Sequence, residues 1–212
     1  MIDKWLSKSK LKNGIEKLAN KLLLGKISAN QLTITGLIIG LLSSFFIFLS
    51  GILLWKLELI VCSIVLMVIS FFFDALDGAV ARLEESTTFG GILDIFCDRT
   101  VEVSIIIALI STDPLILMWP GIFSLGAVIL CITMFLLVGA SVKAKDLEES
   151  KKVIYYRHGL MERSETLLFL LFTTIFIVWR FILLWAFAVL VFITALLRLR
   201  DANIIFKTGK VI

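Results

Sequence analysis

Long apolar runs separated by short polar segments occupy most of this chain. A helix that spans a bilayer needs about 20 largely apolar residues, and six stretches approach or exceed that length. They cover residues 31–55, 57–81, 90–111, 115–140, 164–181 and 182–199. The fifth and sixth stretches nearly touch, and Arg180 marks the turn between them. The pattern predicts an all-α integral membrane protein whose six transmembrane helices form one catalytic domain over 31–212.

Residues 1–30 have a different pattern. Apolar residues recur there at helical spacing between lysines, which predicts an amphipathic helix that lies on an anionic membrane surface. A simple anchoring role for the lysines explains the same pattern equally well. A charged segment followed by a short apolar run and a small-residue cleavage site is not found, so we expect no removed signal peptide.

The composition excludes several classes of protein. The chain is 59% hydrophobic and 18% charged, whereas an ordinary globular domain is about half apolar and about a quarter charged. Soluble, disordered and disulfide-rich folds are therefore excluded. Cys62, Cys97 and Cys131 each stand alone in an apolar run, and we interpret them as small buried hydrophobic residues, not as metal ligands.

The basic residues predict the orientation in the membrane. Lys and Arg gather in the N-terminal segment, the 143–163 loop and the C-terminal tail, and the opposite side has only Lys56 and Arg180. Because cytoplasmic loops are enriched in Lys and Arg, both termini of this cell-membrane protein should be cytoplasmic. The net charge of +4 is thus a topology signal. A basic groove interleaved with aromatic residues is missing, so we expect no nucleic-acid partner.

Four acids lie inside predicted transmembrane helices, where a charge is costly and indicates function by default. Asp74 and Asp77 are three residues apart on the second helix, and Asp94 and Asp98 are four apart on the third. Each pair therefore shares one helix face, and the short connection brings the two faces together near the cytoplasm. Four carboxylates in a poorly hydrated place need positive charge between them. Oxygen ligands favour one or two ions of Mg²⁺, Mn²⁺ or Ca²⁺.

Pairing with nearby arginines is the alternative explanation. Arg82 and Arg99 are available, but two cations cannot neutralise four acids. Arg99 and Glu102, three residues apart, are expected to pair with each other. Gly78 and Ala81 extend the face of the first acidic pair, where small side chains admit a neighbouring backbone or a flat ligand. Together with Arg82, such a surface suits a diphosphate bridged to metal.

The acidic segment carries a family resemblance. Residues 74–82 read D-A-L-D-G-A-V-A-R and residues 90–98 read G-G-I-L-D-I-F-C-D. They resemble the signature D-x-x-D-G-x-x-A-R, then G-x-x-x-D-x-x-x-D, of the CDP-alcohol phosphotransferase family, with every fixed position present and a spacer one residue shorter than usual. Residues 30–33 (N-Q-L-T) are similar to the family's opening of the first helix, with Ala29 in place of proline.

Two later segments resemble the branch of this family that makes phosphatidylinositol phosphate. They are 142–145 (V-K-A-K) and 159–163 (G-L-M-E-R), and Arg198 matches a third basic position of that branch. Ser141 stands where tyrosine is common, and Thr166 stands where a second arginine often follows.

The resemblance implies a six-helix fold, usually dimeric, with a polar cavity that faces the cytoplasm. It implies CDP-diacylglycerol or CDP-archaeol as donor, CMP as leaving group, and Mg²⁺ or Mn²⁺, as two ions. The implied metal ligands are Asp74, Asp77, Asp94 and Asp98, of which Asp98 is also the general base. The implied CDP-binding residues are Asn30, Thr33, Asp77, Gly78, Ala81, Arg82 and Gly90.

The acceptor site is predicted from three cations. Lys143, Arg163 and Arg198 come from separate cytoplasmic helix ends and could converge on one anion, although the positive-inside rule also places cations there. We expect a phosphorylated polyol as acceptor, inositol phosphate ahead of glycerol phosphate, because serine would need fewer cations. His158 is interpreted as an interfacial polar residue and not as a catalyst.

Two other classes use similar residues. Intramembrane prenyltransferases bind diphosphates through aspartate motifs, but their motifs lie on well-separated helices, and here both fall within 74–98. A divalent-cation channel or transporter would use the four acids as its lining. Such proteins usually show internal repeats or broken helices, which this sequence lacks, and Arg82 would repel a permeating cation.

Overall fold

The computed structural model describes residues 27–54, 56–84, 87–148, 161 and 163–208. Within these residues the structure has six α-helices, one 3₁₀ turn and no strand. The elements are α3 (Ala29–Ile52), α4 (Lys56–Leu83), α5 (Thr88–Thr112), α6 (Pro114–Glu148), α7 (Arg163–Ile175), η2 (Ile177–Trp179) and α8 (Arg180–Thr208). Residues 1–26 of the amphipathic helix predicted over 1–30 lie outside the described residues. The last two residues of that prediction, Ala29 and Asn30, belong to α3.

Side-chain caps set where two of these helices begin. The Ser28 hydroxyl accepts a hydrogen bond from the Gln31 N–H, and the Gln31 side chain accepts one from the Ser28 N–H. Thr87 caps α5 in a similar way, because its hydroxyl accepts a hydrogen bond from the Gly90 N–H at 3.0 Å. Such caps satisfy backbone donors that the first turn of a helix leaves without partners. They fix the starts of α3 and α5 at the same end of the bundle.

Four of the described helical segments are long and apolar enough to cross a membrane, namely 29–52, 56–83, 114–140 and 177–204. The predicted six-helix count agrees with the six helices described, but the predicted fifth helix, 164–181, is too long. Its helix ends at Ile175 after 13 residues, and η2 then turns the chain into α8. At 1.5 Å per residue, α7 is only about 20 Å long.

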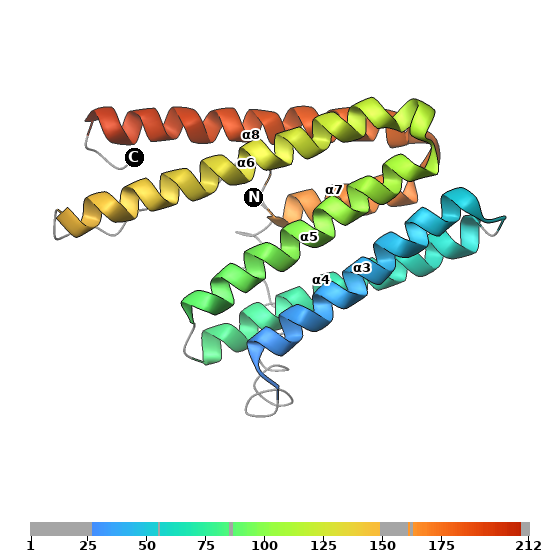
Figure 1. Ribbon diagram of the computed structural model, residues 1–212, viewed down its shortest axis with the longest axis horizontal. Coiled ribbons are helices and arrows are strands. Elements are labelled where there is room, and N and C mark those ends of the chain that lie inside the picture. The colour runs from blue at the N-terminus through green and yellow to red at the C-terminus, as the bar shows by residue number, and fades with distance from the viewer. Residues whose placement is uncertain (1–26, 55, 85–86, 149–160, 162, 209–212) are drawn as a thin grey trace, which may run out of the picture.

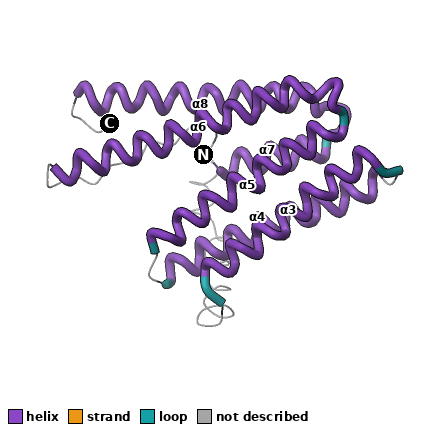
Figure 2. Tube along the Cα trace, viewed as in Figure 1, coloured by secondary structure: helices purple, strands orange, loops and turns teal. Residues whose placement is uncertain are grey.

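The helices pack as two antiparallel pairs with α5 and α7 between them (Figure 1). One pair is α3 with α4, and the other is α6 with α8. The α3–α4, α5–α6 and α7–α8 turns all lie at one end of the bundle (Figure 2). The start of α3, the end of α4 and the start of α5 lie at the other end, which we call the site end.

Small residues bring α3 close to α4 and α5. A Cβ on Gly40 would lie 2.6 Å from a methyl carbon of Val101 on α5, so only glycine fits that crossing. Ser43 donates a hydrogen bond to the carbonyl of Ser63 at 2.9 Å, and Ser70 donates one to the carbonyl of Gly36 at 2.8 Å. Close backbones with interhelical hydrogen bonds are typical of helices packed in membranes.

The cysteines follow their prediction only in part. Cys97 and Cys131 are buried, as predicted, and contribute to the packed interior. Cys62 is exposed, so the prediction that it is buried is wrong. It lies on the outer face of α4, because an apolar run in a membrane protein does not distinguish a side chain that faces the core from one that faces outward.

Candidate active site

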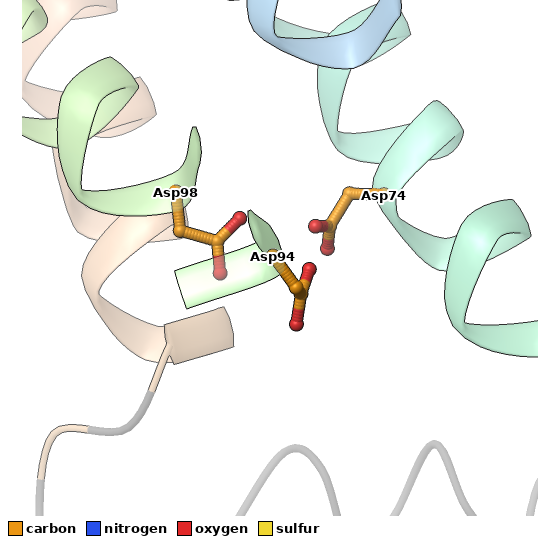
Figure 3. A group of neighbouring side chains, drawn as sticks. All are labelled: Asp74, Asp94 and Asp98. Atoms are coloured by element: carbon orange, nitrogen blue, oxygen red, sulfur yellow. The ribbon is translucent and has the colours of Figure 1, made fainter. Parts of the chain in front are cut away.

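Three of the four predicted acids converge between α4 and α5. One carboxylate oxygen from each of Asp74, Asp94 and Asp98 lies within 4.8 Å of the others. Their side chains point toward a common region between the two helices (Figure 3). We call this group the carboxylate trio. Its all-oxygen donor set suits a hard divalent cation such as Mg²⁺ or Mn²⁺.

Asp77 lies next to the trio and does not belong to it. Its side chain is 5% exposed, and it lines the same cavity as Asp74 and Asp94. All four acids were predicted to converge. Three of them do so in the structure, and the fourth, Asp77, lies beside them.

An arginine from a distant part of the chain pairs with all three acids of the trio. Arg163, the first residue of α7, forms ion pairs with Asp74 and Asp98 through its Nη2 atom. Its Nη1 atom lies 3.3 Å from both carboxylate oxygens of Asp94. From the sequence, Arg82 and Arg99 are the available partners of these acids, and Arg163 is expected to bind the acceptor. Contact across this much of the chain leaves no spacing signal in the sequence, so this pairing could not be predicted.

A cavity of about 500 Å³ opens on one side of Arg163 at the site end. Six of the seven predicted CDP-binding residues line it: Asn30, Thr33, Asp77, Gly78, Ala81 and Gly90. Asp74 and Asp94 of the trio also line it, as do Glu84 and Thr87, which the sequence analysis did not single out. We call this space the site-end cavity.

Arg82 is the predicted residue that does not line the site-end cavity. It is exposed in the last turn of α4. One of its guanidinium nitrogens lies 3.5 Å from the position that a Cβ on Gly78 would occupy. The side chain therefore runs back along its own helix toward the glycine that borders the cavity.

Gly90 keeps the starts of α3 and α5 close together. A Cβ there would lie 3.0 Å from the Thr87 hydroxyl and 3.2 Å from the Asn30 side-chain oxygen. These distances are too short for an ordinary carbon contact, so a larger residue would displace either the cap of α5 or the amide of Asn30. The glycine thus holds one wall of the site-end cavity in place.

A second cavity, of about 290 Å³, lies on the other side of Arg163 between α5, α6, α7 and α8. We call it the inner cavity. Asp94 and Arg163 line both cavities, whereas Asp98 and Arg198 line the inner one and not the site-end one. Two of the three predicted acceptor cations therefore share this cavity. The side chain of the third, Lys143, lies outside those that the structure describes.

Arg198 is held in place by α6. Its Nη1 atom donates a hydrogen bond to the Cys131 carbonyl at 2.9 Å, and its guanidinium carbon lies 5.3 Å from the centre of the Phe135 ring. Its Nε atom has no hydrogen-bond partner among the described residues. An arginine fixed by neutral groups keeps its charge available for an anion in the cavity.

The predicted pairing of Arg99 with Glu102 is confirmed. Both residues line the inner cavity, and Glu102 is 1% exposed. The buried glutamate thus pairs with Arg99 on its own helix, and Arg163 is the arginine that contacts the trio.

These features define a class of protein. Polar groups that could hold a cation lie among membrane-crossing helices, and two cavities meet at shared charged residues. Such a site can hold two substrates with their reacting atoms side by side. Residues 26–197 match the model of the CDP-alcohol phosphatidyltransferase family. The chain belongs to this family of membrane transferases, which confirms the predicted resemblance and disfavours the channel and prenyltransferase alternatives.

The chain is similar to two named proteins. It is 36% identical over 98 residues to the archaetidylinositol phosphate synthase of Pyrococcus horikoshii. That match covers 46% of this chain and 48% of the relative, so it spans about half the length of each. It is 29% identical over 185 residues to the inner membrane protein YnjF of Escherichia coli, covering 86% of each chain. The protein is accordingly a multi-pass membrane protein.

Solved structures confirm the fold. The structure of Mycobacterium tuberculosis phosphatidylinositol phosphate synthase (PgsA1) with CDP-DAG bound matches with a TM-score of 0.68 at 22% identity, covering 89% of this chain and 92% of that one. The same enzyme in complex with manganese and citrate matches with a TM-score of 0.69 at 22% identity, covering 89% and 88%. At this identity the likeness establishes the predicted fold of the family.

Proposed function

We propose that the protein transfers a phosphatidyl or archaetidyl group from a CDP-linked lipid to a hydroxyl of a phosphorylated polyol and releases CMP. Inositol phosphate is the favoured acceptor. The observation that carries the proposal is the pair of cavities that meet at Asp94 and Arg163. The names of the relatives support it, since one is an archaetidylinositol phosphate synthase and another a phosphatidylinositol phosphate synthase.

The site-end cavity is proposed to hold the CDP group. Its volume of about 500 Å³ falls in the range of small-molecule sites, roughly 300–1,000 Å³. Gly78, Ala81 and Gly90 give it walls without bulky side chains, which lets a flat base or a diphosphate approach the backbone. The CDP-DAG bound to the related synthase supports this assignment.

The carboxylate trio is proposed to hold Mg²⁺ or Mn²⁺, with Asp77 as the fourth acid of a two-ion site. The manganese complex of the related synthase supports this. A bound divalent cation would neutralise charge on the diphosphate oxygens and so make CMP a better leaving group. Arg163 contacts the same three carboxylates, so its guanidinium would give up these contacts in the loaded enzyme. It would then face the inner cavity, which it already lines.

Asp98 is proposed as the general base, because it lines the inner cavity and not the site-end one. The oxygen of the acceptor hydroxyl would bond to the phosphorus next to the lipid, and its proton would pass to Asp98. The bond from that phosphorus to the bridging oxygen would break, and CMP would leave with that oxygen. Arg198, Arg163 and Lys143 are proposed to hold the acceptor phosphate through charge-assisted hydrogen bonds.

The proposed orientation places the site end and both termini in the cytoplasm. We call the end with the α3–α4, α5–α6 and α7–α8 turns the turn end. Among the described basic side chains, Lys56 and Arg180 are the two at the turn end, and the others lie toward the site end. A soluble phosphorylated acceptor would then reach the site from the cytoplasm. We also propose a homodimer, which the family resemblance implies, and the mass of the purified protein in detergent tests it.

An acceptor panel tests the proposed function. Purified protein with Mg²⁺ and either CDP-diacylglycerol or CDP-archaeol is given inositol phosphate, glycerol phosphate, serine or inositol, and CMP is measured. We expect CMP with inositol phosphate and little with the others. CMP with glycerol phosphate or serine instead would keep the chemistry and change the acceptor. No CMP with any alcohol would contradict the proposal.

A variant in the inner cavity separates the two substrates. Arg198→Ala should raise the KM for the acceptor and leave the KM for the donor unchanged, because Arg198 lines the inner cavity alone. Arg200→Ala, which removes an exposed cation two residues along the same helix, is the matched control. Equal changes in both constants for Arg198→Ala would contradict the phosphate pocket.

A further inference from the structure

The two basic side chains at the turn end of the bundle lie in the same cavity. Lys56 begins α4 and Arg180 begins α8, and both line a space of about 360 Å³. It forms where the α3–α4, α5–α6 and α7–α8 turns meet (Figure 2). Cations are disfavoured on the side of a membrane protein that faces away from the cytoplasm. Two of them in one cavity therefore call for a local explanation.

Arg180 is buried with neutral partners. It is 5% exposed, and it donates hydrogen bonds to the carbonyls of Thr173 and Thr174 at 3.3 and 3.2 Å. It donates a third to the Thr112 hydroxyl at 3.0 Å. The partial negative charge of the carbonyls at the end of α7 offsets part of the cost of burial, but no described carboxylate pairs with it. A guanidinium has five N–H donors, so two remain available.

Lys56 adds a second positive charge to the cavity, and it is not among the residues that hydrogen-bond the end of α7. It is exposed and lines the cavity, and it forms no ion pair with a described residue. Asp113 is the one acid among the lining residues, and its carboxylate accepts a hydrogen bond from the Ile116 N–H at 3.4 Å, where it caps α6. The cavity therefore has an excess of one positive charge. The Ser50 and Thr112 hydroxyls also line the cavity, and they donate hydrogen bonds to the carbonyls of Ile47 and Leu109.

We propose that this cavity binds the phosphate group of an anionic ligand, either a phospholipid headgroup from the leaflet opposite the active site or free phosphate. A fork-shaped guanidinium and an ammonium are groups that hold phosphate oxygens in proteins. The remaining wall is apolar and includes Ile60, Ile177 and Phe181, which suits the glycerol and upper acyl chain of a lipid. This site is separate from the catalytic cavities, and it stands whether or not the proposed reaction is correct.

The test measures bound lipid on the full-length protein by native mass spectrometry in detergent. The probes are phosphatidylglycerol, which is anionic, and phosphatidylcholine, which is zwitterionic. We expect one phosphatidylglycerol to be retained in preference to phosphatidylcholine, and Lys56→Gln to lower its occupancy about fivefold. The matched control, Arg200→Gln, removes one exposed cation at the site end and should leave occupancy unchanged. Equal occupancy in Lys56→Gln and Arg200→Gln, or equal retention of both lipids, would overturn the proposal.

Two further measurements identify the source of the phosphate and distinguish lost binding from lost folding. Displacement of phosphatidylglycerol by millimolar inorganic phosphate would show that the anion alone suffices, and its retention would show that the lipid chains contribute. Arg180→Lys keeps the charge but loses the fork, and it should weaken phosphatidylglycerol binding with no loss of helical signal in circular dichroism. Undiminished phosphatidylglycerol binding by a folded Arg180→Lys would exclude Arg180 as the phosphate ligand and overturn the proposal.

Discussion

Asp98→Asn tests the division of labour between the two cavities. The change keeps the size of the side chain and removes its ability to accept a proton. General-base catalysis contributes about 10²- to 10⁴-fold in rate, or about 3–5 kcal/mol of activation free energy. We therefore expect kcat to fall by that factor. The affinity for the CDP-lipid should stay unchanged, because Asp98 is not among the residues that line the site-end cavity.

The assay must separate a lost base from a lost metal ligand, because Asp98 is also a member of the carboxylate trio. CMP release is measured at rising Mn²⁺ until it no longer increases, and binding of the CDP-lipid is measured in parallel. A lost base is not restored by more metal. Asp201→Asn, at an acid paired with Arg200 on α8, is the control and should behave as wild type. Turnover within about threefold of wild type at saturating Mn²⁺ would refute the assignment of Asp98 as general base.

Three further changes test the packing and charge balance around the site. Arg163→Gln should bind Mn²⁺ about tenfold more tightly in spectroscopic titrations, since no charge-assisted contact then has to be broken; unchanged affinity would contradict competition for the trio. Gly40→Ala should lower the free energy of unfolding by about 1–3 kcal/mol, while Gly126→Ala, where an added Cβ meets nothing within 4 Å, should not lower the melting temperature. Glu102→Gln should lower the free energy of unfolding by about 1–3 kcal/mol, because it removes the ion-pair partner of Arg99. The control Asp201→Asn breaks an exposed ion pair and should lower the free energy of unfolding by under about 1 kcal/mol. Equal melting temperatures for Glu102→Gln and Asp201→Asn would argue against a stabilising Arg99–Glu102 pair.

The sequence predicted the helices well where apolar runs end at caps or polar residues. The first helix was expected over 31–55 and extends over Ala29–Ile52, where the Ser28 cap sets its start. The fifth was predicted too long because Phe176 and η2 are themselves apolar, so hydrophobicity continues through the break. Arg180, which the sequence indicates as the turn, donates hydrogen bonds to the Thr173 and Thr174 carbonyls near the end of α7.

The site could be predicted where its residues are close in the sequence. The spacing of Asp74, Asp94 and Asp98 was enough to place them together, because helix periodicity and a short connection fix their faces. The position of Arg163 depends on how α7 packs between α4 and α5, which no local pattern encodes. For the same reason, the sequence could not show that one arginine borders both cavities, or that Arg82 lies outside the site-end cavity.

The depth of the trio within the bundle has an energetic consequence for a lipid substrate. From Asp74 to Leu83, the end of α4, the helix rises roughly 13 Å at 1.5 Å per residue. The reacting groups thus lie well inside the ends of the helices. Pulling a lipid into water costs about 0.8 kcal/mol for each CH₂ group exposed, or on the order of 20 kcal/mol for two long chains. With the site at this depth, the acyl or isoprenoid chains of the donor can stay in the lipid bilayer throughout turnover. Only the small polar acceptor has to diffuse into the site.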